Sequence, residues 1–147
     1  MIEYIQGDLF ESSSTILAHA CNCQGTWGAG VARVFKSKFP KAFKEYNAHC
    51  KSHSPTELLG TTFLANTGDG RYVACMFTSN FTGIHKLSVK EIVHFTNLST
   101  ADLVSQINGK DVSMPKINSG LFGVPWEDTE EVLTPFTDDV DIKVYCI

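Results

Sequence analysis

Hydrophobic positions along the chain follow two periods, and together these predict strands that alternate with helices. Short apolar runs bounded by polar or glycine residues predict six strands, over residues 2–5, 15–21, 61–65, 72–77, 112–117 and 142–147. Apolar residues at helical spacing predict helices over 31–39, 42–50 and 89–107, and a last helix that begins at Pro125. Pro40 ends the first of these helices, and a Ser88–Glu91 capping box opens the third.

The segments between the strands indicate how the sheet is arranged. The tetrapeptide Thr67-Gly68-Asp69-Gly70 predicts a hairpin that joins the third and fourth strands. The alternation of strands and helices predicts an α/β fold of three layers, α-β-α, with helices on both faces of a central mixed six-stranded sheet. No repeat, linker or low-complexity tract interrupts the pattern, so we expect residues 1–147 to form one domain.

Two glycine-rich loops each follow a predicted strand and precede a predicted helix. The first lies in HACNCQGTWGAGVAR, residues 19–33, and the second in MPKINSGLFGVPW, residues 114–126. This order directs backbone N–H groups and a helix N-terminus at whatever lies beyond the strand, which favours an anion. Either loop alone is equally well explained as a tight connection, but in open α/β sheets ligands bind beyond the carboxyl ends of strands. The pair therefore predicts a site in which two loops hold a diphosphate.

Charge and cysteine content narrow the classes of function. The formal net charge of −4 and the lack of clustered Lys and Arg argue against a nucleic-acid-binding surface. Five cysteines, an odd number without CxxC spacing, indicate reduced core thiols rather than disulfides or a zinc site. The sequence has neither a recognisable signal peptide nor an apolar run long enough to span a membrane, so we expect a soluble protein of the cytoplasm or nucleus.

Standard phosphate-handling motifs are missing from both loops. A Rossmann fingerprint counted from Gly28 would need glycine where Arg33 stands, and no GK[ST] follows to make a P-loop. A thiol phosphatase needs arginine six positions after its cysteine, and Cys21, Cys23 and Cys75 are not followed in that way. HExxH and paired zinc ligands are also absent, so the sequence predicts no metal site and no cofactor.

The two loops and their flanking strands resemble the macro domain family, an ADP-ribose-binding α/β module, over essentially the whole chain. The resemblance rests on Gly7-Asp8-Leu9 after the first strand, Asn22 after the second, Gly28-Ala29-Gly30-Val31-Ala32, and Asn118-Ser119-Gly120-Leu121-Phe122-Gly123-Val124. Within the family, the strings HACNCQGTWGAGVA, FTSNF and MPKINSGLFGVPW are similar to the small fungal ADP-ribose 1''-phosphate phosphatases. The resemblance implies a monomer whose small-molecule ligand is ADP-ribose or ADP-ribose 1''-phosphate.

The resemblance also implies a role for each part of the site. Asp8 would accept a hydrogen bond from the adenine amino group, Leu9 would add a backbone contact, and the first loop would hold the diphosphate. Asn22 would face the distal ribose, and the second loop would close over it with Phe122 against the sugar. The implied ligand-binding set is Gly7, Asp8, Leu9, Ala20, Cys21, Asn22, Trp27, Gly28, Ala29, Gly30, Val31, Ala32, Asn118, Ser119, Gly120, Leu121, Phe122 and Gly123.

Three residues are candidates for catalysis at a terminal phosphate: His19, Asn22 and His85. His19 lies inside a buried strand, where a histidine is more often a core residue than an acid or base. Asn22 ends that strand, and a buried amide there needs partners that ribose hydroxyls would supply. For His85, a surface role and a role as catalytic acid are equally open. Gln24 is open between a solvated loop residue and one that orients water, and Trp27 is expected to be a lid or packing aromatic.

Several activities remain compatible with these letters. Related domains that remove ADP-ribose from protein glutamates use a lysine after the fourth strand and an aspartate in the second loop, where this chain has Ser79 and Phe122. This difference counts against removal of ADP-ribose from proteins, and the resemblance to the fungal subgroup makes a metal-independent phosphatase acting on ADP-ribose 1''-phosphate the leading interpretation. Two alternatives stay open: a hydrolase of another ADP-ribose derivative such as the O-acetyl ester, and a non-catalytic ADP-ribose-binding module.

Overall fold

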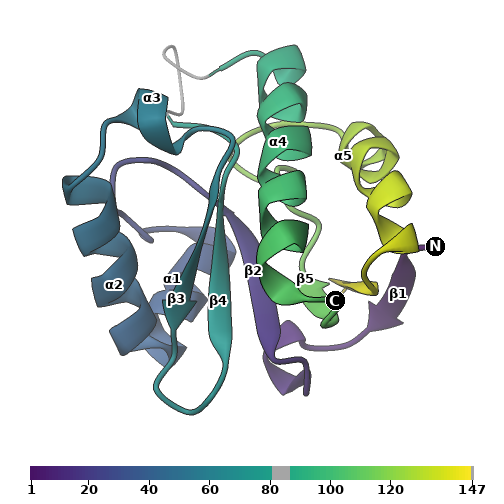
Figure 1. Cartoon of the computed structure of the whole chain (residues 1–147), viewed down its shortest axis with the longest axis horizontal. Coiled ribbons are helices and arrows are strands. Elements are labelled where there is room, and N and C mark those ends of the chain that lie inside the picture. The colour runs from purple at the N-terminus through teal and green to yellow at the C-terminus, as the bar shows by residue number, and fades with distance from the viewer. Residues whose placement is uncertain (81–86, 147) are drawn as a thin grey trace.

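A six-stranded sheet runs through the computed structural model, which describes residues 1–80 and 87–146 (Figure 1). Its strands are β1 (Glu3–Gln6), β2 (Ile16–Cys21), β3 (Thr62–Asn66), β4 (Tyr72–Phe77), β5 (Val112–Met114) and β6 (Ile142–Cys146). They lie in the order β1-β6-β5-β2-β4-β3, and every neighbouring pair is parallel except the β3–β4 hairpin. The predicted mixed sheet and its hairpin are confirmed.

Helices cover both faces of this sheet, as the alternation of elements predicts. The helices are α1 (Gly30–Lys38), α2 (Pro40–Lys51), α3 (Pro55–Leu58), α4 (Val89–Ile107) and α5 (Trp126–Leu133), with short 3-10 turns η1 (Leu9–Glu11) and η3 (Thr134–Asp138). In Figure 1, α1 and α2 lie on one side of the sheet and α4 and α5 on the other. The Ser88–Glu91 capping box of α4 is present as predicted.

The core is divided by the sheet into two buried clusters. Alternate residues of β2 face opposite sides: Leu17 and Cys21 pack with the α1–α2 layer, whereas Ile16 and Ala18 pack with the α4–α5 layer. Because β2 is buried on both faces, it reads as a continuous apolar run rather than an alternating one. This burial explains why the strand was recognisable from sequence.

Besides shifts of one or two residues at most element ends, three differences from the predicted elements are informative. The predicted strand 112–117 ends at Met114, because the next residue, Pro115, has no N–H with which to continue the ladder. Pro125 is the N-cap of α5 rather than its first helical residue. Helix α3 was not predicted, although Ser54 and Glu57 form a capping box that the sequence carries.

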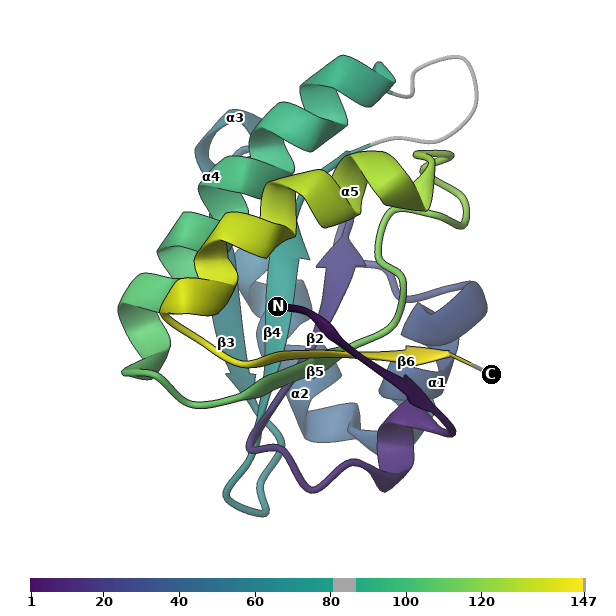
Figure 2. The same ribbon diagram turned by 90° about the vertical axis from the view of Figure 1, so that its right-hand side faces the viewer.

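Parallel pairing brings the carboxyl ends of five strands to the same end of the sheet. The first glycine loop leaves β2 after Cys21 and the second follows β5 after Met114, and these two strands are neighbours. At the far edge β1 and β6 lie side by side (Figure 2), and the Gly7 N–H donates to the Cys146 carbonyl at 2.8 Å. Both loops and the turn after β1 therefore lie at the end of the sheet where the parallel strands have their carboxyl ends. Among the described residues, no helix is long and apolar enough to cross a membrane.

Candidate functional site

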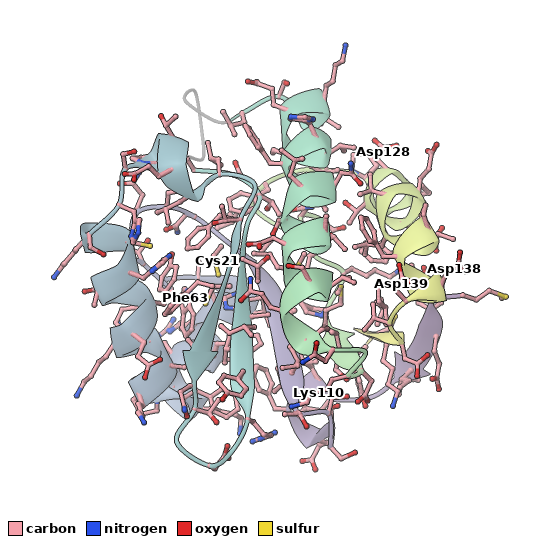
Figure 3. The ribbon with its side chains drawn as sticks, viewed as in Figure 1. Cys21, Phe63, Lys110, Asp128, Asp138 and Asp139 are labelled. Atoms are coloured by element: carbon pink, nitrogen blue, oxygen red, sulfur yellow. The ribbon has the colours of Figure 1, made fainter. Side chains whose placement is uncertain are left out.

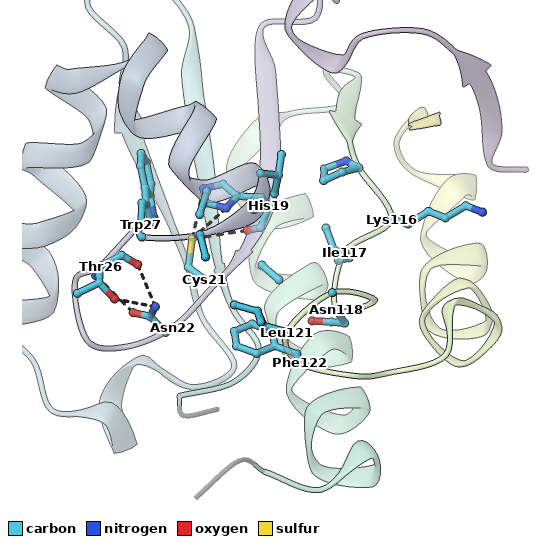
Figure 4. A pocket seen from close by; sticks show the side chains of 18 residues that line it. His19, Cys21, Asn22, Thr26, Trp27, Lys116, Ile117, Asn118, Leu121 and Phe122 are labelled. Atoms are coloured by element: carbon cyan, nitrogen blue, oxygen red, sulfur yellow. Dashed lines mark hydrogen bonds between the residues drawn. The ribbon is translucent and has the colours of Figure 1, made fainter. Parts of the chain in front are cut away.

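Two adjoining cavities at this end of the sheet share part of their lining, and together they are called the groove below. The first, about 460 Å³ (Figure 4), is lined by residues 19–22, 26–32, 115–118 and 120–122. The second, about 810 Å³, is lined by residues 6–10 together with Val34, Lys38 and Tyr145. Gly30, Val31 and Pro115 line both cavities, so the two adjoin. Asp8 lines only the second cavity and Asn22 only the first, and the start of α1 contributes to both.

The first glycine loop forms the wall of the groove where helix α1 begins. Ala29 is the N-cap of α1 and makes no side-chain capping hydrogen bond, so no side chain of the cap occupies the helix N-terminus. Gly30 has φ +60°, and a Cβ added there would meet nothing within 4 Å. Glycine is favoured at Gly30 by this left-handed backbone rather than by crowding. The open space beside it belongs to the groove.

The second glycine loop is fixed from behind by Asn118, which has φ 67°. The Thr78 hydroxyl donates to Asn118 Oδ1 at 2.7 Å, and Asn118 Nδ2 donates to Thr96 Oγ1 at 3.0 Å and to Thr129 Oγ1 at 3.4 Å. Its carbonyl accepts from the Val124 N–H at 2.9 Å, which closes the loop. The Asn118 side chain therefore ties the loop to the segment that follows β4, to α4 and to α5, and its amide is held by these three threonines.

His19 lies beneath the groove in an aromatic cluster. Its ring stacks on Phe35 and meets Trp27 edge-on at 4.8 Å, and the residue is 1% exposed. Its two ring nitrogens lie 3.5 and 3.8 Å from the sulfur of Cys21 (Figure 4). This is the core role that the sequence favoured. Trp27 is also 1% exposed and stacks on Tyr46, so it packs inside and is not a lid.

Asn22 does not need a ligand to satisfy its amide. Its Nδ2 donates to the Thr26 carbonyl at 2.9 Å and to Thr26 Oγ1 at 3.0 Å, while its Oδ1 accepts from the Gln24 N–H and the Tyr46 hydroxyl. The expectation that this amide lacks partners without ribose was wrong, because sequence cannot reveal the turn that supplies them. Gln24 in turn donates from Nε2 to Asn80 Oδ1 at 2.8 Å, so it is fixed in the loop.

Asp8 caps the short turn after β1 and also lines the groove. Its carboxylate accepts from the Phe10 N–H at 2.9 Å and so caps η1. The residue is nevertheless exposed and lines the second cavity, and its carboxylate has acceptor positions beyond the one used by the cap.

The other predicted ligand residues are distributed unevenly. Gly7, Leu9, Ala20, Cys21, Gly28, Ala29, Val31, Ala32, Gly120, Leu121 and Phe122 line one cavity or the other, whereas Ser119 and Gly123 line neither. His85 lies outside the described residues. Residues that sequence reasoning missed are Gln6, Phe10, Thr26, Val34, Lys38, Pro115, Lys116, Ile117 and Tyr145. Val34 and Lys38 were recognisable in principle, since they follow Gly30 at helical spacing on α1.

Among the residues that the structure describes, few charged side chains line the groove. They are Asp8, Lys38 and Lys116, whereas the acidic residues Asp128, Asp138 and Asp139 lie with α5 and η3 (Figure 3). Burial raises the pKa of Cys23, next to Asn22, to about 12, so its thiol stays protonated at neutral pH. Within residues 1–80 and 87–146, no group of three or more His, Cys, Asp or Glu is placed to hold a metal ion. The groove thus presents mainly apolar side chains and backbone groups to a ligand.

Comparison with known families decides how this groove is classified. The Macro domain family matches residues 18–133, which include both glycine loops. The chain belongs to the macro domain family. Among solved structures, the macrodomain of Mycobacterium tuberculosis DarG is 26% identical, with a TM-score of 0.83 and coverage of 100% of this chain and 98% of that one. The predicted macro domain fold is confirmed.

More similar macro domain proteins are fungal. A Meyerozyma guilliermondii protein named ADP-ribose 1''-phosphate phosphatase is 48% identical, with 99% of this chain and 98% of that protein aligned. Proteins of the same name from Candida albicans and Saccharomyces cerevisiae are 45% and 32% identical; the alignments cover 100% and 98% of this chain, and 100% and 97% of those proteins. The similarity therefore extends over the whole domain and is not confined to the two loops.

Proposed function

We propose that this protein is a phosphatase that hydrolyses ADP-ribose 1''-phosphate to ADP-ribose and inorganic phosphate without a required metal ion. The observation that carries the proposal is the pair of adjoining cavities, which together have room for both halves of a dinucleotide and are lined by both glycine loops. The full-length similarity to fungal proteins named for this reaction supports the same substrate. We further propose that the protein acts as a monomer in the cytoplasm or nucleus and does not bind nucleic acid.

The ligand would lie along the groove with its adenine at the Asp8 end. There the exposed carboxylate can accept from the adenine amino group while still capping η1. The diphosphate would lie at the start of α1, where uncapped N–H groups and the helix dipole stabilise negative charge. The distal ribose and its terminal phosphate would then occupy the first cavity, between Asn22 and the second loop.

Hydrolysis at that end needs few chemical groups. Water forms a new bond to phosphorus, the bond from phosphorus to the ribose oxygen breaks, and the released ADP-ribose takes up the proton. Positioning and backbone N–H groups aimed at the phosphoryl oxygens would supply most of the rate enhancement. Asn22 would hold the first loop in the required shape, His19 would support it from the core, and His85 remains the candidate acid.

Phosphate release tests the proposal. Purified protein is incubated with ADP-ribose 1''-phosphate, with and without EDTA, and inorganic phosphate is followed over time. We expect release in both arms, and a parallel incubation with O-acetyl-ADP-ribose is expected to be slower. Tight binding of ADP-ribose with no turnover of either ester would make the protein a binding module, and preferred cleavage of the acetyl ester would make it an esterase.

A further inference from the structure

The orientation of the Asn22 amide follows from its neighbours without ambiguity. The Gln24 backbone N–H, which can only donate, lies 2.9 Å from Asn22 Oδ1. The Thr26 carbonyl, which can only accept, lies 2.9 Å from Asn22 Nδ2. The oxygen of the amide must therefore face Gln24 and the nitrogen must face Thr26.

A buried tyrosine fixes the same amide from behind. Tyr46 Oη lies 2.7 Å from the Asn22 carbonyl oxygen and 2.8 Å from Asn22 Oδ1. Both atoms only accept, so the Tyr46 hydroxyl is the donor. The Tyr46 ring is fully buried and stacks on Trp27 and Phe77, and burial raises the pKa of its hydroxyl, which keeps the donor protonated at neutral pH.

The third member of this chain of hydrogen bonds reaches the groove. Thr26 Oγ1 lies 3.0 Å from Asn22 Nδ2 and accepts from it, so the hydroxyl hydrogen of Thr26 must point elsewhere. Thr26 is exposed and lines the first cavity, and none of its hydrogen bonds within the described residues uses that hydrogen. Figure 4 shows Thr26 and Asn22 joined at the end of the cavity.

We propose that the Thr26 hydroxyl donates a hydrogen bond to the terminal phosphate of the ligand, and that Tyr46 acts as a positioning residue through Asn22. The inference rests on the proposed function, because that function places a phosphate at this end of the groove. Thr26 lines the first cavity only and Asp8 the second only, whereas Gly30 and Val31 of the first loop line both. A donor whose oxygen already accepts from an amide is polarised toward an anion, which strengthens the bond that it gives.

Thr26→Val and Thr26→Ser form a matched pair, since valine removes only the hydroxyl and serine keeps it. Thr26→Val is expected to lower kcat/KM for ADP-ribose 1''-phosphate about 10- to 100-fold, the usual range for a hydrogen bond to a charged group. Its Kd for ADP-ribose, which lacks that phosphate, should change less than about twofold, and Thr26→Ser should restore most of the loss. If the wild-type protein shows no turnover, only the proposed function fails. Because ADP-ribose 1''-phosphate is then not consumed, calorimetry can compare its Kd and that of ADP-ribose between Thr26→Val and the wild type.

The positioning role has its own test. Tyr46→Phe should lower kcat/KM in the same direction, and the Tyr46→Phe, Thr26→Val double variant should be no slower than Thr26→Val alone, because both act through one hydroxyl. Tyr72→Phe, a half-buried tyrosine remote from the groove, is the control and should match the wild type. Wild-type behaviour of Thr26→Val, equal loss of affinity for both ligands, or additive losses in the double variant would overturn the inference. If Tyr46→Phe does not fold, Thr26→Val and Thr26→Ser still test whether the Thr26 hydroxyl donates to the terminal phosphate.

Discussion

The imidazole of His19 stacks on the ring of Phe35, with ring centroids 4.2 Å apart and ring planes inclined by 11°. A histidine held in this way contributes to the core first and to chemistry only if its nitrogens reach the ligand. Those nitrogens contact Cys21, and the residue is almost fully buried.

We therefore expect His19→Phe to fold, because a second aromatic ring can maintain the stack, and to keep kcat within about fivefold of the wild type. His19→Ala should instead lower the free energy of unfolding by about 3 kcal/mol, since it removes a buried ring and leaves a cavity. Thermal melts and turnover at a temperature well below each midpoint distinguish these effects. A folded His19→Phe that loses more than 100-fold in kcat would identify the imidazole as an acid or base.

Asp8 should set the preference for adenine. Asp8→Ala is expected to weaken ADP-ribose binding by about 1.5–3 kcal/mol, the usual contribution of a hydrogen bond to a charged group. Asp8→Asn keeps an oxygen that can cap η1, so it separates the loss of charge from the loss of the cap. Calorimetry on both variants gives the dissociation constants. An unchanged constant for Asp8→Ala would leave Asp8 with its capping role alone.

Gly30→Glu should abolish ADP-ribose binding without unfolding the protein. The added side chain would extend into the open space of the groove, where its carboxylate would repel the diphosphate. Gly70→Glu is the matched control: Gly70 also has positive φ and open space at its Cβ, but it lies in the β3–β4 hairpin. The control should carry similar backbone strain and bind normally. Binding by a folded Gly30→Glu would show that the first loop does not hold the diphosphate.

Stability should depend on pH through Asp111. The Ser14 hydroxyl, which donates to its carboxylate at 2.8 Å, and Lys143 beside it hold the pKa of Asp111 below its ordinary value of 3.8. A lowered pKa in the folded state stabilises the fold above the ordinary value, and this contribution disappears as pH falls through the folded pKa. Asp111→Asn should therefore be less stable than wild type at pH 7, by under about 1 kcal/mol because the site is partly exposed, and the difference should shrink below pH 4. Denaturant unfolding across this range measures it, and a constant difference would exclude the carboxylate as the cause.

Much of the fold could be predicted because its determinants are local. The buried strand β2, the Ser88 cap and the turn at 67–70 are each determined by a few neighbouring residues, so the sequence pattern predicts them. The site was only partly accessible to such reasoning. The sequence of the second loop marks Asn118 as a candidate ligand residue, yet its amide bonds to three threonines that are distant in the sequence. Tyr145 lines the groove only because β6 pairs with β1. Such positions depend on tertiary contacts, which one sequence does not reveal.

The two cavities are expected to form one site for ADP-ribose, which can be tested by comparing the binding of ADP-ribose with that of AMP. AMP offers the adenine end but lacks the second phosphate and the distal ribose. Calorimetric titration should give a micromolar or lower dissociation constant for ADP-ribose, about −8 kcal/mol or more favourable, and a much weaker one for AMP. Equal affinity for the two ligands would mean that the first cavity and both glycine loops take no part in binding, and a single ADP-ribose site across both cavities would then be excluded.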